Sequence, residues 1–182
     1  APAKGWQGKD LPWRTNDWVA FLGASYFRAI GDEFQYGLSA RGIMVDAAVG
    51  GKAEEFPDFT HIWLESGPGE SVTAYGLLDG PSLAGAYRFV MTRGRGVTID
   101  VEKHLFIRRD IERLGIAPLT SMFWYSETIK PTAVDWRPEV HDSDGLALWT
   151  GAGERAWRPL NNPGRTIASS FSDNAPRGFG LM

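Results

Sequence analysis

Residues 59–65 decide the fold class, and they read Phe59-Thr60-His61-Ile62-Trp63-Leu64-Glu65. In an extended chain the odd-numbered residues of this segment fall on one face and the even-numbered residues on the other. The same period of two continues through residues 72–78, 86–91 and 97–101. This alternation predicts a series of β-strands.

Clusters of glycine, proline and serine separate these runs, at residues 66–69, 79–82 and 93–96. Such clusters are typical of tight turns. Closely spaced strands with no long helical pattern between them indicate an antiparallel sandwich or barrel, so we expect an all-β fold. The one helical turn that we expect covers residues 110–114, ends at Gly115 and cannot continue past Pro118.

Composition argues against several classes of function. The 182 residues carry a net charge of −3, so no basic surface is available for nucleic acid. The chain has no cysteine, which excludes disulfides, a thiolate nucleophile and cysteine metal sites. No stretch approaches the ~18–20 apolar residues that a membrane span needs. We expect no cofactor, no metal, no nucleic acid partner and no membrane span.

The two ends of the chain suggest a piece of a larger fold. The first residue is Ala1 and no signal peptide is visible. Residues 1–17 are rich in glycine, proline, lysine and tryptophan, and we expect an irregular lead-in there. The last residues, 177–182, are apolar and strand-like, whereas a domain usually finishes on a polar or frayed segment. We therefore expect residues 18–182 to be an incomplete sandwich.

Ionisable side chains are densest between residues 138 and 145, at Glu139, His141, Asp142 and Asp144. In an extended strand the first two point one way and the last two the other. Two carboxylates on one face repel each other, which raises one pKa toward the range useful for proton transfer. The alternative is a hairpin turn over residues 142–145 that caps its own backbone. A calcium loop is a third interpretation, although the remaining EF-hand ligands do not follow.

Tryptophans at positions 124, 136, 149 and 157 surround this acidic segment. Sugar rings present apolar C–H faces edged by hydroxyls, so sugar sites combine a flat aromatic ring with carboxylates and arginines. The alternative is that these rings fill the core of a sandwich. Their density beside two carboxylates favours a carbohydrate ligand. His61 and His104 stand alone on strand-like segments, where we expect hydrogen-bonded wall residues rather than metal ligands.

Several strings, ordered from about residue 19 to the end, resemble the periplasmic glucan biosynthesis protein G/D family. They are Ser25-Tyr26-Phe27-Arg28-Ala29, Gln35-Tyr36-Gly37-Leu38-Ser39-Ala40-Arg41-Gly42, Glu54-Glu55-Phe56-Pro57, Leu77-Leu78-Asp79, Gly85-Ala86-Tyr87, Leu114-Gly115-Ile116-Ala117-Pro118-Leu119-Thr120-Ser121-Met122-Phe123, His141-Asp142-Ser143-Asp144, Trp157-Arg158-Pro159-Leu160-Asn161-Asn162-Pro163 and Gly178-Phe179-Gly180-Leu181.

The resemblance implies a large β-sandwich of the galactose-mutarotase-like type, followed in full-length members by an immunoglobulin-like domain that this chain would lack. This chain would cover the middle and later part of the sandwich. The resemblance also implies a periplasmic protein that acts on β-1,2-linked glucan, with inversion at the anomeric carbon in the active members. Hydrolysis, transglycosylation and a purely glucan-binding scaffold all remain open, as does a structural role.

In active members of this family the first Asp of the His-Asp-Ser motif is the general base, which carries over to Asp142. The general acid lies well downstream of the Gly-Phe-Gly-Leu string, so we expect these 182 residues alone to be inactive. The expected partners are β-1,2-glucan and the remainder of the same polypeptide.

Position near the quoted strings suggests further site residues. Ser143 and Asp144 would orient Asp142 or its water. Five residues are candidates to line the glucan groove: Tyr26, Arg28, Arg41, Trp157 and Arg158. Structural ion pairing is the alternative for Arg28 and Arg41. The sequence departs from the family pattern at Arg155, where the family commonly has tryptophan, so sugar contacts or linkage preference would differ there.

Overall fold

The computed structural model describes residues 17–31, 38–132, 134–160, 165 and 167–182. The strands of the large sheet and of most of the smaller sheets pair antiparallel, which confirms the predicted all-β fold class. Except for Asp17, the irregular lead-in expected over residues 1–17 lies outside the described residues. The chain divides into two compact units, one of residues 1–36 and 40–118 and the other of residues 37–39 and 119–182.

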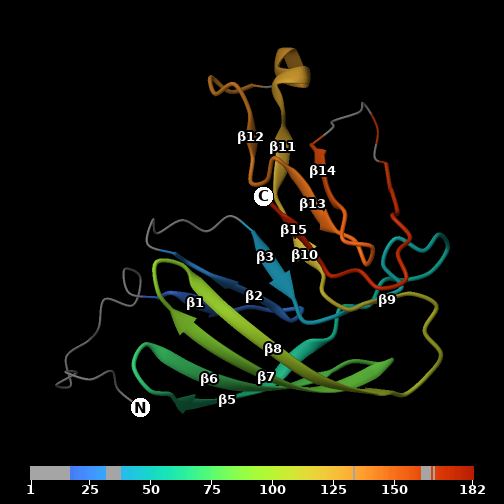
Figure 1. Cartoon of the computed structure of the whole chain (residues 1–182). Coiled ribbons are helices and arrows are strands. Elements are labelled where there is room, and N and C mark those ends of the chain that lie inside the picture. Colours follow the sequence, from blue (N-terminus) through green and yellow to red (C-terminus); the bar gives the residue numbers. More distant parts are fainter. Residues whose placement is uncertain (1–16, 32–37, 133, 161–164, 166) are drawn as a thin grey trace. The chain divides into compact units, whose positions relative to one another are not determined.

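The strands of the first unit fall into small and large sheets, shown in blue to yellow-green in Figure 1. Their bounds are β1 (Val19–Phe21), β2 (Tyr26–Ala29), β3 (Ser39–Arg41, whose first residue counts with the second unit), β4 (Met44–Val45), β5 (Asp58–Ser66), β6 (Ser71–Asp79), β7 (Leu83–Arg93), β8 (Val97–Ile107) and β9 (Leu114–Gly115).

Strands β5 to β8 form one sheet in sequence order, with each strand hydrogen-bonded to the next. The connections at residues 67–70, 80–82 and 94–96 confirm the turns expected from glycine, proline and serine. One face of the sheet carries the core, because alternate residues of β6 and β7 are buried. The buried cluster comprises Phe27, Ile43, Val45, Ala74, Leu78, Leu83, Tyr87, Phe89 and Met91.

A second layer, made by β1 and β2, packs on this core face (Figure 1). Phe21 and Phe27 each lie 5.1 Å from the ring of Phe89, edge to face. Offset and edge-to-face pairs add to the stability that burial of the rings already provides. The first unit is therefore a two-layer arrangement of sheets around an aromatic core.

The alternation predicted for residues 59–65 is interrupted after its first residue. A bulge between Phe59 and His61 places one extra residue in β5, so Phe59 pairs with buried Leu78 whereas His61 pairs with exposed Leu77. Phe59 packs inward, 5.6 Å from Phe89. The expectation that Phe59 shares a face with Trp63 was therefore wrong, because the inserted residue reverses the side-chain period.

The helical turn predicted over residues 110–114 is also absent. The backbone N–H groups of Glu112 and Arg113 donate to the Asp46 carboxylate, at 3.1 and 2.8 Å. The next residue, Leu114, pairs with Val45 as part of the β4–β9 ladder. A distant side chain and a distant strand thus take the hydrogen bonds that a helical turn would have made for itself.

The second unit holds two small sheets and one short 3₁₀ helix. Its elements are β10 (Leu119–Thr120), β11 (Phe123–Tyr125), η1 (Glu127–Thr132), β12 (Val140–His141), β13 (Gly145–Trp149), β14 (Arg155–Pro159) and β15 (Gly178–Leu181). Strand β11 pairs with β12, and β13 lies between β14 and β15 (Figure 1). Across the described ranges, no helix has the length and apolar character needed to cross a membrane.

Candidate functional site

The two aspartates of the acidic segment, at positions 142 and 144, directly follow β12 at the end of the β11–β12 pair. Phe123 lies opposite His141 in this pair, and its ring stacks on the imidazole with 6.2 Å between ring centroids. The strand ends at His141, so residues 142–144 bend rather than extend. The expectation that the carboxylates of residues 142 and 144 share one strand face therefore fails, since its premise of an extended strand does not hold.

Backbone groups of Met122 hold Asp142 on both sides. The Asp142 N–H donates to the Met122 carbonyl at 2.9 Å, and the Met122 N–H donates to Asp142 Oδ2 at 3.2 Å. Asp142 is exposed, and no described residue donates to its other oxygen, Oδ1. The carboxylate is thus held through one oxygen, and its other oxygen is open to accept a hydrogen bond from outside the described residues.

The interpretation of residues 142–145 as a self-capping hairpin turn does not describe this structure. The segment joins β12 to β13, and these two strands do not pair with each other. The Asp142 side chain accepts its hydrogen bond from Met122, 20 positions earlier, and not from its own turn. Among the described residues no group of three metal-ligating side chains gathers.

Ser143 and Asp144 flank Asp142 but engage other partners. Ser143 is 8% exposed and its hydroxyl lies 2.6 Å from that of Ser121, which ties the acidic segment to the strand connection before β11. The Asp144 carboxylate is exposed and lies 3.7 Å from His141 Nδ1. That these two residues orient Asp142 or its water stays a prediction, and their observed contacts orient the backbone around it.

His141 lies between the carboxylates of Glu139 and Asp144. The contact with Glu139 follows from the sequence, because residues two positions apart in a strand point the same way. The His141 Nε2 lies 2.8 Å from Glu139 Oε2, as expected for residues that share a strand face. Its Nδ1 is buried and without a hydrogen-bond partner in the described part of the chain, with Asp144 3.7 Å away. The imidazole side chain is only 8% exposed, so it lies inside the segment, hydrogen-bonded to Glu139 and near Asp144.

The connection between β11 and β12 is held by its own ion pair. Arg137 donates to both oxygens of Asp135, at 2.9 and 2.7 Å. These hydrogen bonds hold the pKa of the Asp135 carboxyl well below its usual range. Buried Tyr125 donates its hydroxyl to the Arg137 carbonyl at 3.0 Å, so the connection is anchored to β11.

Trp157 lies beside the acidic segment because of Gly145. A Cβ atom on Gly145 would lie 2.4 Å from the Arg158 carbonyl oxygen and 2.7 Å from the Trp157 ring. Only glycine fits there, so the indole packs over the residue that directly follows Asp144. The structure therefore brings this predicted groove residue to the end of the sheet where the candidate base lies.

Arg158 points away from Trp157, to the other face of the β13–β14–β15 sheet. Successive residues of a strand face opposite sides, and the Arg158 guanidinium lies 5.4 Å from the ring of Phe171. Arg158 and Phe171 line a pocket of about 490 Å³ on that side. The two residues expected to line one groove thus belong to different faces.

The remaining predicted groove residues, Tyr26, Arg28 and Arg41, belong to the first unit. Arg41 lies opposite Tyr26 in the β2–β3 pair, and its guanidinium lies 3.9 Å from the Tyr26 ring and 4.1 Å from the Phe56 ring. Arg28 lies opposite Ala20. Two aromatic rings hold the Arg41 cation, and no described carboxylate pairs with it, so the ion-pair alternative is not observed for this residue.

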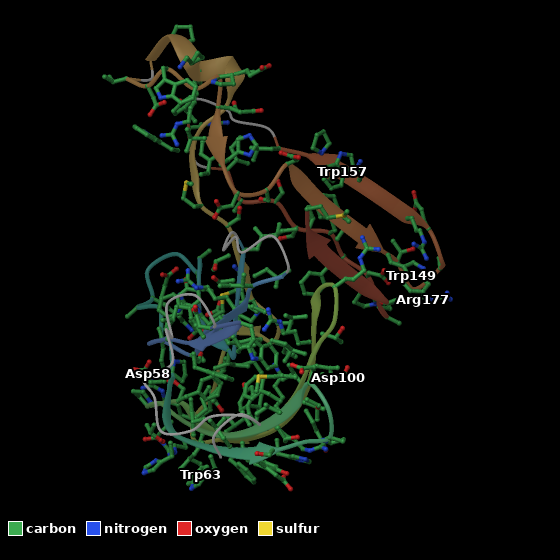
Figure 2. The ribbon with its side chains drawn as sticks, turned by 90° about the vertical axis from the view of Figure 1, so that its left-hand side faces the viewer. Asp58, Trp63, Asp100, Trp149, Trp157 and Arg177 are labelled. Carbon is green, nitrogen blue, oxygen red and sulfur yellow. The ribbon has the colours of Figure 1, made fainter. Side chains whose placement is uncertain are left out.

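Sequence reasoning missed one cluster, around Trp149. Arg155 lies opposite Trp149 across the β13–β14 pair, with its guanidinium 4.7 Å from the indole, and that of Arg177 is 5.6 Å away. Figure 2 shows Trp149 and Arg177 together, with Trp157 toward the other end of the same small sheet. The strand pairing needed to foresee this cluster joins residues 149 and 178, which no local pattern reveals.

The fold and this site define an all-β protein with an exposed, backbone-held carboxylate beside a tryptophan-bearing sheet. The family described as "Periplasmic glucan biosynthesis protein, MdoG" matches residues 7–182. The chain belongs to this family, which confirms the resemblance recognised in the sequence.

Similar curated proteins carry related names. Glucans biosynthesis protein D 2 of Ralstonia nicotianae is 67% identical over 177 residues, which are 96% of this chain and 33% of that protein. Glucans biosynthesis protein D of Stenotrophomonas maltophilia is 56% identical over 168 residues, or 91% of this chain and 31% of that protein. Probable glucans biosynthesis protein D of Shewanella oneidensis gives the same three percentages. The chain spans about a third of the length of these relatives.

Proposed function

We propose that the whole protein acts in the periplasm on β-1,2-linked glucan, as an inverting endo-β-1,2-glucanase or transglycosylase in glucan biosynthesis. Membership of the periplasmic glucan biosynthesis family supports the pathway and the compartment. The observation that carries the catalytic part is the Asp142 carboxylate, which is exposed, fixed through Oδ2 by the Met122 N–H, and adjacent to the Trp157-bearing sheet.

In this proposal Asp142 is the general base. Its carboxylate takes a proton from the attacking hydroxyl, whose oxygen bonds to the anomeric carbon from the face opposite the leaving group. The C–O glycosidic bond breaks, and a general acid protonates the departing oxygen. Water as the attacking group gives hydrolysis, and a sugar hydroxyl gives transfer. We assign the general acid to a part of the whole protein outside these 182 residues, so this chain alone would be inactive.

The second candidate is a non-catalytic glucan-binding scaffold for the same biosynthesis. The observation that favours it is the half-exposed pair Trp149 and Trp157, accompanied by Arg155 and Arg177, since these residues suit sugar binding without any chemistry. In that case Asp142 binds a sugar hydroxyl and transfers no proton.

The experiment compares the whole protein with its Asp142→Asn variant on linear β-1,2-glucan. We expect the wild type to give shorter, cyclised or transferred glucans with inverted anomeric configuration by NMR, and the variant to be slower by about 10²–10⁴-fold. Asp100→Asn, an equally conservative change at an exposed carboxylate of β8, is the control and should keep full activity.

Three results would decide between the candidates. Loss of activity in Asp142→Asn, with an unchanged unfolding temperature, supports the base. Glucan binding by the wild type without any product supports the scaffold. Full activity in Asp142→Asn removes the assignment of Asp142. Recovery of the whole protein in the periplasmic fraction tests the compartment separately.

A further inference from the structure

One face of the β13–β14–β15 sheet forms a shallow trough of about 370 Å³. Residues directly opposite each other in antiparallel strands share a face, which groups Ala147 with Trp157 and Gly180, and Trp149 with Arg155 and Gly178. We call this face the glycine-floored trough; the lining residues whose positions share this face are Ala147, Trp149, Arg155, Trp157, Gly178 and Gly180.

Among the described residues, nothing requires glycine at the two floor positions. Neither Gly178 nor Gly180 has a positive φ, so the backbone suits any L-residue. A Cβ atom placed on either would meet no described atom within 4 Å. Glycine inside a strand weakens it, and it often marks a place where a ligand approaches the backbone closely. What the two glycines provide is open space above the floor.

The sides of the trough carry groups that suit a sugar. Trp149 is 39% exposed and Trp157 is 45% exposed, so both indoles offer surface to a ligand. The guanidinium group of Arg155 lies 4.7 Å from the Trp149 ring, and it makes no ion pair with a described residue. Its N–H donors are therefore left for acceptors such as hydroxyl oxygens.

We propose that the glycine-floored trough binds consecutive glucose residues of a linear glucan chain, between Trp157 and Trp149. The indoles contact the apolar C–H faces of the sugar rings, and Arg155 donates hydrogen bonds to their hydroxyls. A volume of about 370 Å³ is within the range of small-ligand sites. The inference rests on the proposed function, because it takes glucan as the ligand.

Gly180→Val in the whole protein is the decisive change, since it fills the floor without backbone strain. We expect the dissociation constant for a linear β-1,2-gluco-oligosaccharide, measured by calorimetry, to rise about tenfold or more. We expect the unfolding temperature to stay equal or rise, because valine favours a strand. This combination of weaker binding and unchanged or greater stability is the signature of a residue kept for its ligand.

Gly96→Val is the matched control, because Gly96 also has no positive φ and a Cβ atom placed on it would meet no described atom within 4 Å. It lies in the turn between β7 and β8, outside the trough, and should leave binding unchanged. Should Gly180→Val unfold, Arg155→Gln provides an independent test, since it removes a charged donor from an exposed side chain of the trough and should weaken binding with little change in unfolding temperature.

The outcomes separate the inference from the proposed function. Weaker binding in Gly180→Val or in folded Arg155→Gln, with binding intact in the control, supports the trough. Wild-type affinity in both variants overturns the trough but leaves the proposed function standing. A wild-type protein that binds no β-1,2-glucan overturns both.

Discussion

The β5–β8 sheet and the β13–β14–β15 sheet use glycine in opposite ways. In the first, a Cβ atom on Gly85 would lie 2.9 Å from the Tyr87 ring, and one on Gly76 would lie 3.0 Å from the Phe59 ring. In the second, a Cβ atom on Gly178 or Gly180 would meet no described atom within 4 Å. Glycine lets aromatic rings pack against the backbone in one sheet, whereas it leaves the surface of the other sheet uncovered.

The aromatic residues of the two sheets differ in the same sense. Phe89 is fully buried among Phe21, Phe27, Phe59 and Tyr87. By contrast, the two tryptophans of the second sheet keep much of their surface exposed. Aromatic rings stabilise the fold where they exclude water and mark an interaction surface where they do not, so the same residue types have different consequences in the two sheets.

The largest expected change in the free energy of unfolding comes from a substitution in the core beneath the β5–β8 sheet. Phe89→Ala should lower the free energy of unfolding of the whole protein by about 3–5 kcal/mol, because it removes a buried ring and leaves a cavity. Urea unfolding measures it. Trp149→Ala, the matched change in the second sheet, should cost far less, and an equal loss in both variants would remove the contrast between the sheets.

The next largest loss of stability is expected at Glu55, whose carboxylate holds the turn between β6 and β7. Glu55 accepts hydrogen bonds from the Ser82 N–H at 2.9 Å, the Ser82 hydroxyl at 2.5 Å and Arg109 at 3.1 Å. Burial opposes ionisation, but these bonds outweigh it and keep the pKa of the Glu55 carboxyl below its usual value. Glu55→Gln should cost about 1.5–3 kcal/mol at pH 7, since it replaces charge-assisted bonds by weaker ones.

The same residue predicts a pH dependence. A carboxyl whose pKa is lower in the folded state stabilises the fold above its unfolded pKa and loses that contribution as the pH falls through the folded value. The difference between wild type and Glu55→Gln should therefore shrink below the usual glutamate pKa of about 4.3. Urea midpoints measured between neutral and acidic pH check this, and a constant difference would contradict it.

A smaller loss of stability is expected when Gly85, which packs against the Tyr87 ring, is replaced. Gly85→Ala should destabilise the protein by about 1–3 kcal/mol, because the added methyl group meets a ring that cannot move away. Tyr87 is buried and its hydroxyl donates to the Gly42 carbonyl at 3.0 Å. Thermal unfolding provides the measurement. Unchanged stability would mean that the ring yields and that glycine is not required there.

The smallest effect has the opposite sign. Gly178→Ala should leave the free energy of unfolding unchanged or raise it by about 0.5–1 kcal/mol, because alanine has less conformational freedom to lose on folding. Comparing this variant with Gly85→Ala under the same conditions gives the cleanest test of the contrast. A clear destabilisation would show that the floor of the trough is packed after all.

Local pattern predicted the parts of the fold that depend on neighbouring residues. The alternation and the turn residues located β5 to β8 and their hairpins, since side chains alternate at every residue and consecutive hairpins pair strands that are close in sequence. The bulge in β5 was not predicted, because nothing in residues 59–65 indicates the extra residue. The bulge accompanies the packing of Phe59 in the core beside Phe89.

Long-range partners decided the conformation of several other segments. Residues 110–114 carry a helical signal, yet Asp46 and β4 take their hydrogen bonds. Ala24 and Ser25 adopt left-handed φ values of 54°, which their residue types do not predict, and the Ala24 N–H donates to the Asp58 carboxylate. In each case a contact between distant residues outweighs a weak local preference.

The sequence by itself determined the fold class, the strands of the large sheet, the family and the position of Asp142 as candidate base, because each rests on local order along the chain. Only the tertiary structure decided which neighbours those residues have. In the tertiary structure the Met122 N–H donates to Asp142, and Trp157 and Arg158 lie on opposite faces of their sheet. Gly178 pairs with Trp149. The physical reason is that strand pairing, which joins residues far apart in the chain, determines the face on which each side chain lies.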